Sequence, residues 1–91
     1  MSDTMLPIVR QMHDAEGDKA RARILLSVSD AVLMKYREAF EAACRRASFD
    51  AGLRFIDVRR AEWCAVRGAD GSLPAHFATA RAAFVVFAEA A

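Results

Sequence analysis

The last sixteen residues of the chain, 76–91, hold only four polar side chains among twelve apolar ones. At a helical period, this end of the chain has apolar residues on two opposite sides, so a helix here lacks a polar face for water. One side consists of Leu73, Phe77, Ala80, Phe84, Phe87 and Ala91, and the other of Ala75, Ala78, Ala82, Val85 and Val86. One side can pack on the chain's own core. The apolar residues of the other side predict contact with a partner.

Composition favours a folded globular protein. Of the 91 residues, 55% are hydrophobic and 27% are charged, which is unlike a disordered tail. We expect a single domain spanning residues 1–91, because a chain of this length builds one small core. The formal net charge of +1 predicts no general attraction to nucleic acid or to anionic lipid.

The sequence also bears on location. The first residues lack the basic region and apolar core of a secretory signal, and no apolar run reaches the 18 to 20 residues of a membrane span. Cys44 and Cys64 form neither a CxxC motif nor a pair with a nearby histidine in the sequence. We therefore expect a soluble cytoplasmic protein with reduced, packed thiols and no membrane partner.

The residue types indicate the all-α fold class. Twenty residues are alanine, whereas valine, isoleucine and threonine together number twelve, and alanine favours helices while β-branched residues favour strands. We expect a small bundle of three to four helices with a hydrophobic C-terminal helix. The expected helices cover residues 4–13, residues 29–47, a less regular segment at 50–67, and a last helix capped by Ser72 with Pro74 in its first turn.

Three segments leave an alternative fold open. Residues 23–28 fit either a backward extension of the 29–47 helix or a strand, and residues 53–58 and 63–66 fit a helix or two strands. If all three were strands, the order would be β-α-β-β-α, an α+β sandwich of the ferredoxin-like type. Residues 14–19 and 68–71 are turns in either fold.

No motif predicts a metal site, a cofactor or catalysis. His13, Asp14, Glu16 and Asp18 are metal-ligand types, but their spacing matches no metal-binding loop, and a solvated turn explains them. His76 could activate the thiol of Cys44 or Cys64 if the fold brought them together, yet no orienting group or oxyanion site accompanies them. We expect no enzyme activity, no cofactor and no metal.

Four arginines, at positions 54, 59, 60 and 67, surround Trp63 and suggest an alternative function. Arg54, Arg59, Arg60 and Arg67 would contact phosphates if this segment were the second helix of a helix-turn-helix. Asp57 and Glu62 lie among them as intrachain partners. A salt-bridged surface is therefore the favoured interpretation, and a DNA-binding regulator is the alternative.

The sequence thus predicts a non-enzymatic protein-interaction or regulatory module. It would act as a homodimer, or bind a larger protein, through its C-terminal helix. Aromatic and large aliphatic side chains dominate the energetics of such interfaces. The predicted interface residues are Phe77, Phe84, Val85, Val86, Phe87 and Trp63.

Overall fold

The computed structural model describes residues 7–89, and within them it contains helices and no strand. The six helices are α1 (Pro7–Asp14), α2 (Asp18–Ser27), α3 (Asp30–Lys35), α4 (Arg37–Arg46), α5 (Asp50–Cys64) and α6 (Ala75–Glu89). The all-α prediction is confirmed, but the predicted count of three to four helices is wrong. The ferredoxin-like alternative is also wrong, because residues 23–27 lie in α2 and residues 53–58 lie in α5.

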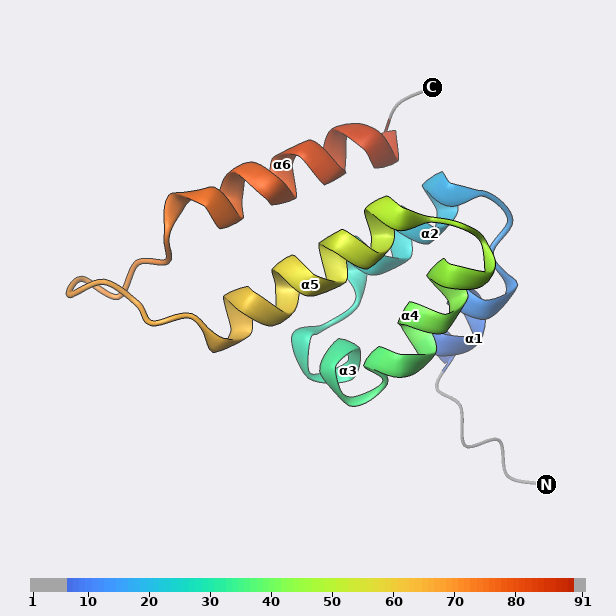
Figure 1. The fold of residues 1–91 in the computed structure, drawn as a ribbon, viewed down its shortest axis with the longest axis horizontal. Coiled ribbons are helices and arrows are strands. Elements are labelled where there is room, and N and C mark those ends of the chain that lie inside the picture. Colours follow the sequence, from blue (N-terminus) through green and yellow to red (C-terminus); the bar gives the residue numbers. More distant parts are fainter. Residues whose placement is uncertain (1–6, 90–91) are drawn as a thin grey trace.

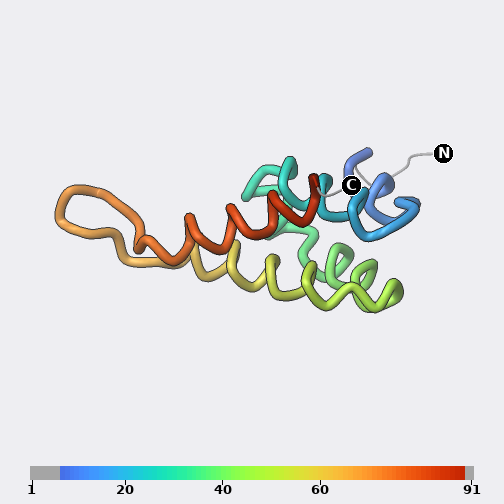
Figure 2. The backbone as a smooth tube through the Cα atoms, turned by 90° about the horizontal axis from the view of Figure 1, so that it is seen from above, coloured from blue at the N-terminus to red at the C-terminus, as the bar shows by residue number. Residues whose placement is uncertain are grey.

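The longest two helices form a hairpin at one side of the molecule. α5 and α6 run antiparallel, and the loop that joins them is at the end farthest from α1 and α4 (Figure 1). α6 packs against both α2 and α5, while α1 packs on α4 (Figure 2). The shortest dimension of the Cα trace is 18 Å, so the molecule is thin.

One buried cluster joins most of the helices. It comprises Val9, Met12, Ala22, Leu25, Val28, Leu33, Phe40, Ala43, Cys44, Phe49, Phe55, Ile56, Phe84 and Ala88. The first helix contributes two of these residues. Residues 4–6 of the predicted first helix lie outside the described residues.

The predicted 29–47 helix is interrupted. Ser29 does cap α3, since its Oγ accepts a hydrogen bond from the amide of Val32 at 3.3 Å, but Tyr36 leaves the helical conformation with φ −110° and ψ 26°. Leu33 and Phe40, on either side of the break, are both fully buried. Because they are seven residues apart, they would share one face of an unbroken helix as well, so periodicity gave no sign of the break.

Residues 23–28 do not extend that helix backward. Residues 23–27 belong to α2, a separate helix that ends where Val28 becomes extended, with φ −68° and ψ 137°. The chain then turns into α3 at Ser29. Because α2 is separate from α3, it can pack against α6.

α4 and α5 approach each other closely. After α4, Ser48 adopts φ 56°, and the amide of Phe49 donates to the carbonyl of Cys44 at 2.8 Å, which is a Schellman ending with serine in place of the usual glycine. Gly52 follows in the first turn of α5. A Cβ at Gly52 would stand 2.6 Å from Cδ2 of Phe49 and 2.8 Å from Sγ of Cys44, so this position has no space for a larger residue.

Hydrogen bonds between its own polar groups stabilise the loop before α6. Asp70 Oδ1 accepts hydrogen bonds from the hydroxyl of Ser72 at 2.6 Å and from its amide at 3.0 Å, and these bonds lower the pKa of Asp70. The prediction that Ser72 caps the last helix is therefore wrong. α6 begins at Ala75, and the amide of Phe77 donates to the carbonyl of Pro74 at 3.2 Å.

Candidate protein-interaction surface

The inward side of α6 belongs to the chain's own interior. Phe77, Phe84 and Ala88 are buried against the body of the molecule. The ring of Phe84 stacks on that of Phe55, with centroids 4.1 Å apart and planes within 7°. Only 6% of Phe77 and 7% of Phe84 is exposed, so these two residues pack mainly within the chain.

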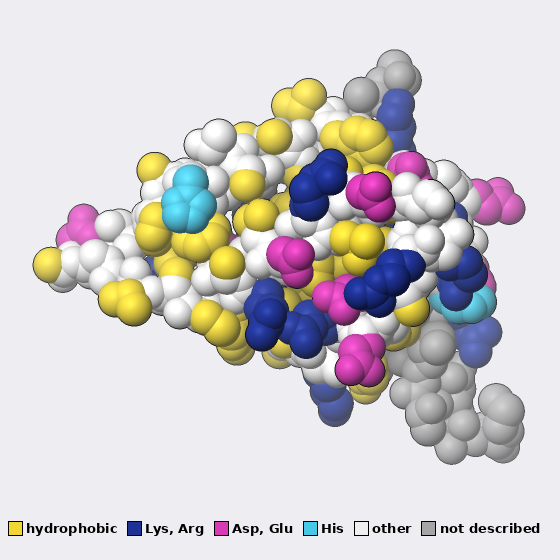
Figure 3. All heavy atoms as spheres, viewed as in Figure 1, with side chains coloured by type: hydrophobic (Ala, Val, Ile, Leu, Met, Phe, Trp, Pro, Cys, Tyr) yellow, Lys and Arg dark blue, Asp and Glu magenta, His cyan; other side chains and the backbone are white. Residues whose placement is uncertain are grey.

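The outward side of α6 is also apolar. Val86 is 68% exposed and Phe87 is 37% exposed. Toward the start of the helix, the exposed residues are Ala75, His76, Ala78, Thr79, Ala82 and Ala83. Hydrophobic side chains follow the edge of the molecule that α6 forms, whereas charged side chains gather over α4 and α5 (Figure 3). Apart from His76 and Thr79, the outward side of α6 therefore carries apolar side chains, unlike the polar face of most water-exposed helices.

The charged residue within this stretch turns away from it. Arg81 donates through Nη2 to Glu62 Oε1 of α5 at 3.1 Å, and its guanidinium lies 5.8 Å from the ring centroid of Phe55. This ion pair joins the two helices of the hairpin. It leaves no charged side chain on the outward side of α6 between residues 75 and 88.

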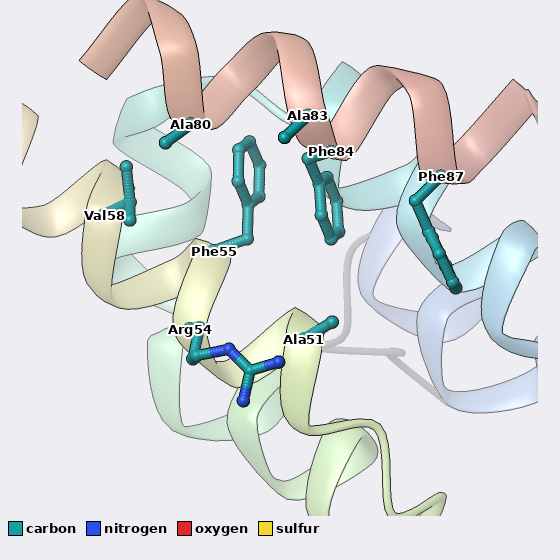
Figure 4. A pocket seen from close by; sticks show the side chains of 8 residues that line it. All are labelled: Ala51, Arg54, Phe55, Val58, Ala80, Ala83, Phe84 and Phe87. Carbon is teal, nitrogen blue, oxygen red and sulfur yellow. The ribbon is translucent and has the colours of Figure 1, made fainter. Parts of the chain in front are cut away.

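A groove of about 230 Å³ runs between α5 and α6. Its walls are almost wholly apolar, and Arg54 at its edge is the one polar residue among them (Figure 4). The lining residues are Ala51, Arg54, Phe55, Val58, Ala80, Ala83, Phe84 and Phe87. The sequence analysis missed the part that α5 contributes, although Ala51, Phe55 and Val58 recur at helical spacing. The groove and the outward side of α6 form one surface, here called the hairpin surface.

The remaining predicted interface residues lie in different surroundings. Val85 is half-buried on α6. Trp63 is 57% exposed near the end of α5, where it lines a separate hollow with Leu73 and Arg67. Trp63 is therefore not part of the hairpin surface.

The four arginines of the nucleic-acid alternative do not share one surface. Arg59 is buried, with 4% exposed, and Arg54 edges the groove. Arg60 lies six positions after Arg54, which is about 240° around the helix axis. Arg67 donates to the carbonyl of Gly71 at 2.7 Å within the loop. These placements do not form the continuous basic face that phosphate contacts require.

Arg59 is a structural residue. Its Nη1 donates to the carbonyl of Leu25 at 2.7 Å, its Nη2 to the carbonyl of Val28 at 2.9 Å, and its Nε to Asp30 Oδ1 at 3.0 Å. The two carbonyls belong to the end of α2, where the helix leaves them without intrahelical partners. Arg59 thus ties α5 to the α2–α3 connection, and its guanidinium is not available to a nucleic acid.

The two cysteines and His76 make no catalytic group. Cys44 is fully buried, and that burial raises the pKa of its thiol from 9.0 to about 11, so the reactive thiolate is disfavoured. Cys64 is exposed at the end of α5. His76 packs beside the ring of Phe77, with ring centroids 4.2 Å apart.

We expect one thiol per folded chain, that of Cys64, to react with a dithionitrobenzoate reagent near neutral pH. Cys44 should react only when the chain unfolds, because its sulfur is buried and protonated. Counting released nitrothiobenzoate before and after adding denaturant measures this. The folded Cys64→Ser variant serves as the control and should release almost none. A rapid reaction of that variant would show that Cys44 is open to solvent.

Polar side chains in the turn between α1 and α2 form hydrogen bonds and ion pairs with nearby residues. His13 Nδ1 lies 3.0 Å from Asp14 Oδ1, and Asp18 pairs with Arg21 at 3.0 Å. Arg21 also donates to the carbonyl of Ala15 at 2.9 Å. Across the described part of the chain, no group of three or more His, Cys, Asp or Glu side chains is arranged to hold a metal ion.

Comparison of the chain with protein-family models, with curated proteins and with solved structures found no match. Of the helices in residues 7–89, none is both long and apolar enough to cross a membrane.

Proposed function

We propose that this chain is a small non-enzymatic protein-interaction or regulatory module. It acts as a homodimer or binds a larger protein, and it does so through the hairpin surface. The observation that carries the proposal is the exposure of Val86 and Phe87 on a helix whose opposite side is already buried. Large exposed apolar patches on small proteins mark interaction sites.

Covering the exposed parts of Val86 and Phe87 would favour binding. Full burial of a valine or phenylalanine side chain contributes about 1.5 to 3 kcal/mol. Phe87 already stacks on Phe49, with ring centroids 5.7 Å apart, so it is held in place before a partner arrives. A preordered aromatic side chain loses little conformational freedom on binding, which favours affinity.

The other functions have less support. A DNA-binding role would need Arg59, whose guanidinium is occupied inside the molecule. An enzyme using Cys44 would need an accessible thiolate, which burial disfavours. The two free thiols support a reducing compartment, and we propose a cytoplasmic location on that ground.

The test compares the wild type with Val86→Glu. We expect the wild type either to exceed the monomer mass in light scattering or to be a monomer that binds an apolar fluorescent dye such as anilinonaphthalene sulfonate. Val86→Glu should weaken association or dye binding at least tenfold, because a charge would have to be buried in the contact. Its circular dichroism spectrum should not change, since Val86 faces solvent in the folded chain.

Val66→Glu is the matched control. It makes the same substitution at an exposed valine in the loop before α6, outside the hairpin surface. This variant should behave as the wild type does. The proposal would be overturned by a wild-type monomer that binds no dye and by a Val86→Glu variant identical to it.

A further inference from the structure

We propose that the hollow beside Trp63 binds a free amino acid with an apolar side chain. The hollow lies where the end of α5, the start of α3 and the loop before α6 meet, and it is separate from the hairpin surface (Figure 1). Its volume is about 440 Å³, within the range of roughly 300 to 1,000 Å³ of small-molecule sites. The lining residues are Asp30, Glu62, Trp63, Ala65, Arg67 and Leu73. The inference goes beyond the proposed function, because it needs no protein partner.

Two carboxylates in the hollow are each held through one oxygen. Arg59 donates through Nε to Oδ1 of Asp30 at 3.0 Å, and Arg81 donates through Nη2 to Oε1 of Glu62 at 3.1 Å. The second oxygen of each carboxylate forms no hydrogen bond within residues 7–89. Both side chains are partly exposed, Asp30 by 47% and Glu62 by 21%. Carboxylates that are already fixed can accept hydrogen bonds from an ammonium group at little cost in conformational freedom.

Arg67 supplies a positive charge to the same hollow. Its Nη1 donates to the carbonyl of Gly71 at 2.7 Å, and within residues 7–89 it forms no ion pair. The loop around it is ordered, since the amide of Gly68 donates to the carbonyl of Ser72 at 2.8 Å. The two carboxylates have arginine partners, so Arg67 carries the uncompensated charge of the hollow. This charge disfavours a ligand that is only a cation and favours one with an anionic group.

A zwitterion satisfies both kinds of polar group. Its carboxylate can pair with Arg67, and its ammonium group can donate to the free oxygens of Asp30 and Glu62. An anion without an ammonium group would leave those two oxygens without a donor. An α-amino acid carries both charges on neighbouring atoms, and its size suits a hollow near the lower end of the small-molecule range.

Trp63 provides the apolar surface for the side chain of the ligand. It is 57% exposed, whereas tryptophan is highly buried on average. Leu73 is half-buried and lines the same hollow. An apolar side chain that packs on these two residues removes their surface from water, and the face of the indole ring also attracts an ammonium group. The hollow therefore offers an apolar amino acid a contact for each of its three parts.

The fluorescence of Trp63 tests the proposal directly, because it is the one tryptophan of the chain. Titration with L-leucine or L-phenylalanine should change its emission along a saturable curve. Two analogues of leucine each lack one charge: 3-methylbutylamine lacks the carboxylate, and 4-methylpentanoate lacks the ammonium group. Each should bind at least about tenfold more weakly than leucine, since it loses charge-assisted hydrogen bonds. Calorimetry of the same mixtures detects any binding that leaves the emission unchanged.

Arg67→Gln tests the assignment of the carboxylate partner. This variant should bind leucine at least about tenfold more weakly, and its circular dichroism spectrum should match that of the wild type because Arg67 lies exposed in a loop. Arg60→Gln is the matched control. Arg60 is also exposed, but it lines a different hollow with Asp57 and Cys64, so this variant should bind leucine as the wild type does.

The outcomes separate the possible ligands. Saturable binding of leucine or phenylalanine that is weakened by the loss of either charge and by Arg67→Gln supports the proposal. Binding of 3-methylbutylamine as tight as that of leucine would overturn it in favour of a cation on Trp63. Equally tight binding of 4-methylpentanoate would overturn it in favour of a simple anion at Arg67. Absence of binding of both amino acids at about 10 mM would overturn the site itself. None of these results bears on the hairpin surface, which Val86→Glu tests separately.

Discussion

Replacing Arg59 with methionine should lower the free energy of unfolding by about 3 kcal/mol, because it removes charge-assisted hydrogen bonds from buried carbonyls. The carbonyls of Leu25 and Val28, at the end of α2, would each lose the hydrogen bond that they accept from Arg59. Asp30 would lose its ion-pair partner. Methionine fills much of the same space, so the loss reports on the polar bonds more than on a cavity. Urea unfolding followed by circular dichroism measures it.

Arg60→Met is the matched control for this prediction. Arg60 is the neighbouring residue on α5 and is exposed, so its replacement should change the free energy of unfolding by no more than about 0.5 kcal/mol. Arg59→Lys should recover only part of the loss, since an ammonium group cannot reach the carbonyls of Leu25 and Val28 and the carboxylate of Asp30 together. Equal stability of the Arg59→Met and Arg60→Met variants would show that the bonds of Arg59 contribute nothing net.

Truncating Phe84 to alanine should cost about 3 to 5 kcal/mol of folding free energy, as for other buried phenylalanines. Its ring stacks on Phe55 at 4.1 Å and lies 6.2 Å from the ring of Phe49, so its loss opens a cavity where α5 and α6 meet. Denaturant unfolding at several protein concentrations measures the change and separates it from effects of self-association.

Phe87→Ala provides the contrast. This residue is one helical turn farther along α6 but partly exposed, so its truncation should destabilise the folded chain by only about 1 kcal/mol. It should weaken self-association more than it weakens folding. If Phe84→Ala and Phe87→Ala had equal effects on unfolding, α6 would not pack on the body in the observed orientation.

Local sequence patterns predicted much of the secondary structure. The excess of alanine over β-branched residues indicated helices, and Ser29 proved to be a helix cap. Ser72 is also a serine at a suitable position, yet its hydroxyl donates a hydrogen bond to Asp70 within the loop and does not cap α6. The interruption at Tyr36 had no local signal, because neither glycine nor proline stands there and the apolar period continues through it.

The candidate site was predictable only in part. Val86 and Phe87 were recognised because the apolar residues of the C-terminal segment exceed what one helix face can bury. Arg59 was misjudged because a buried arginine and an exposed one look alike in sequence. Its partners lie 29 to 34 positions earlier in the chain, and nothing local marks that distance.

The sequence by itself determined that the last helix has two apolar sides, since side-chain type and helical period fix which residues share a face. It did not determine which side turns inward. That choice belongs to the tertiary structure: α2 and α5 enclose Phe77, Phe84 and Ala88, whereas Val86 and Phe87, which the helical period places on opposite sides, are both exposed. The side with the three phenylalanines has more apolar area to bury, but the shape of the surface that distant segments offer to the helix decides which of its residues are covered.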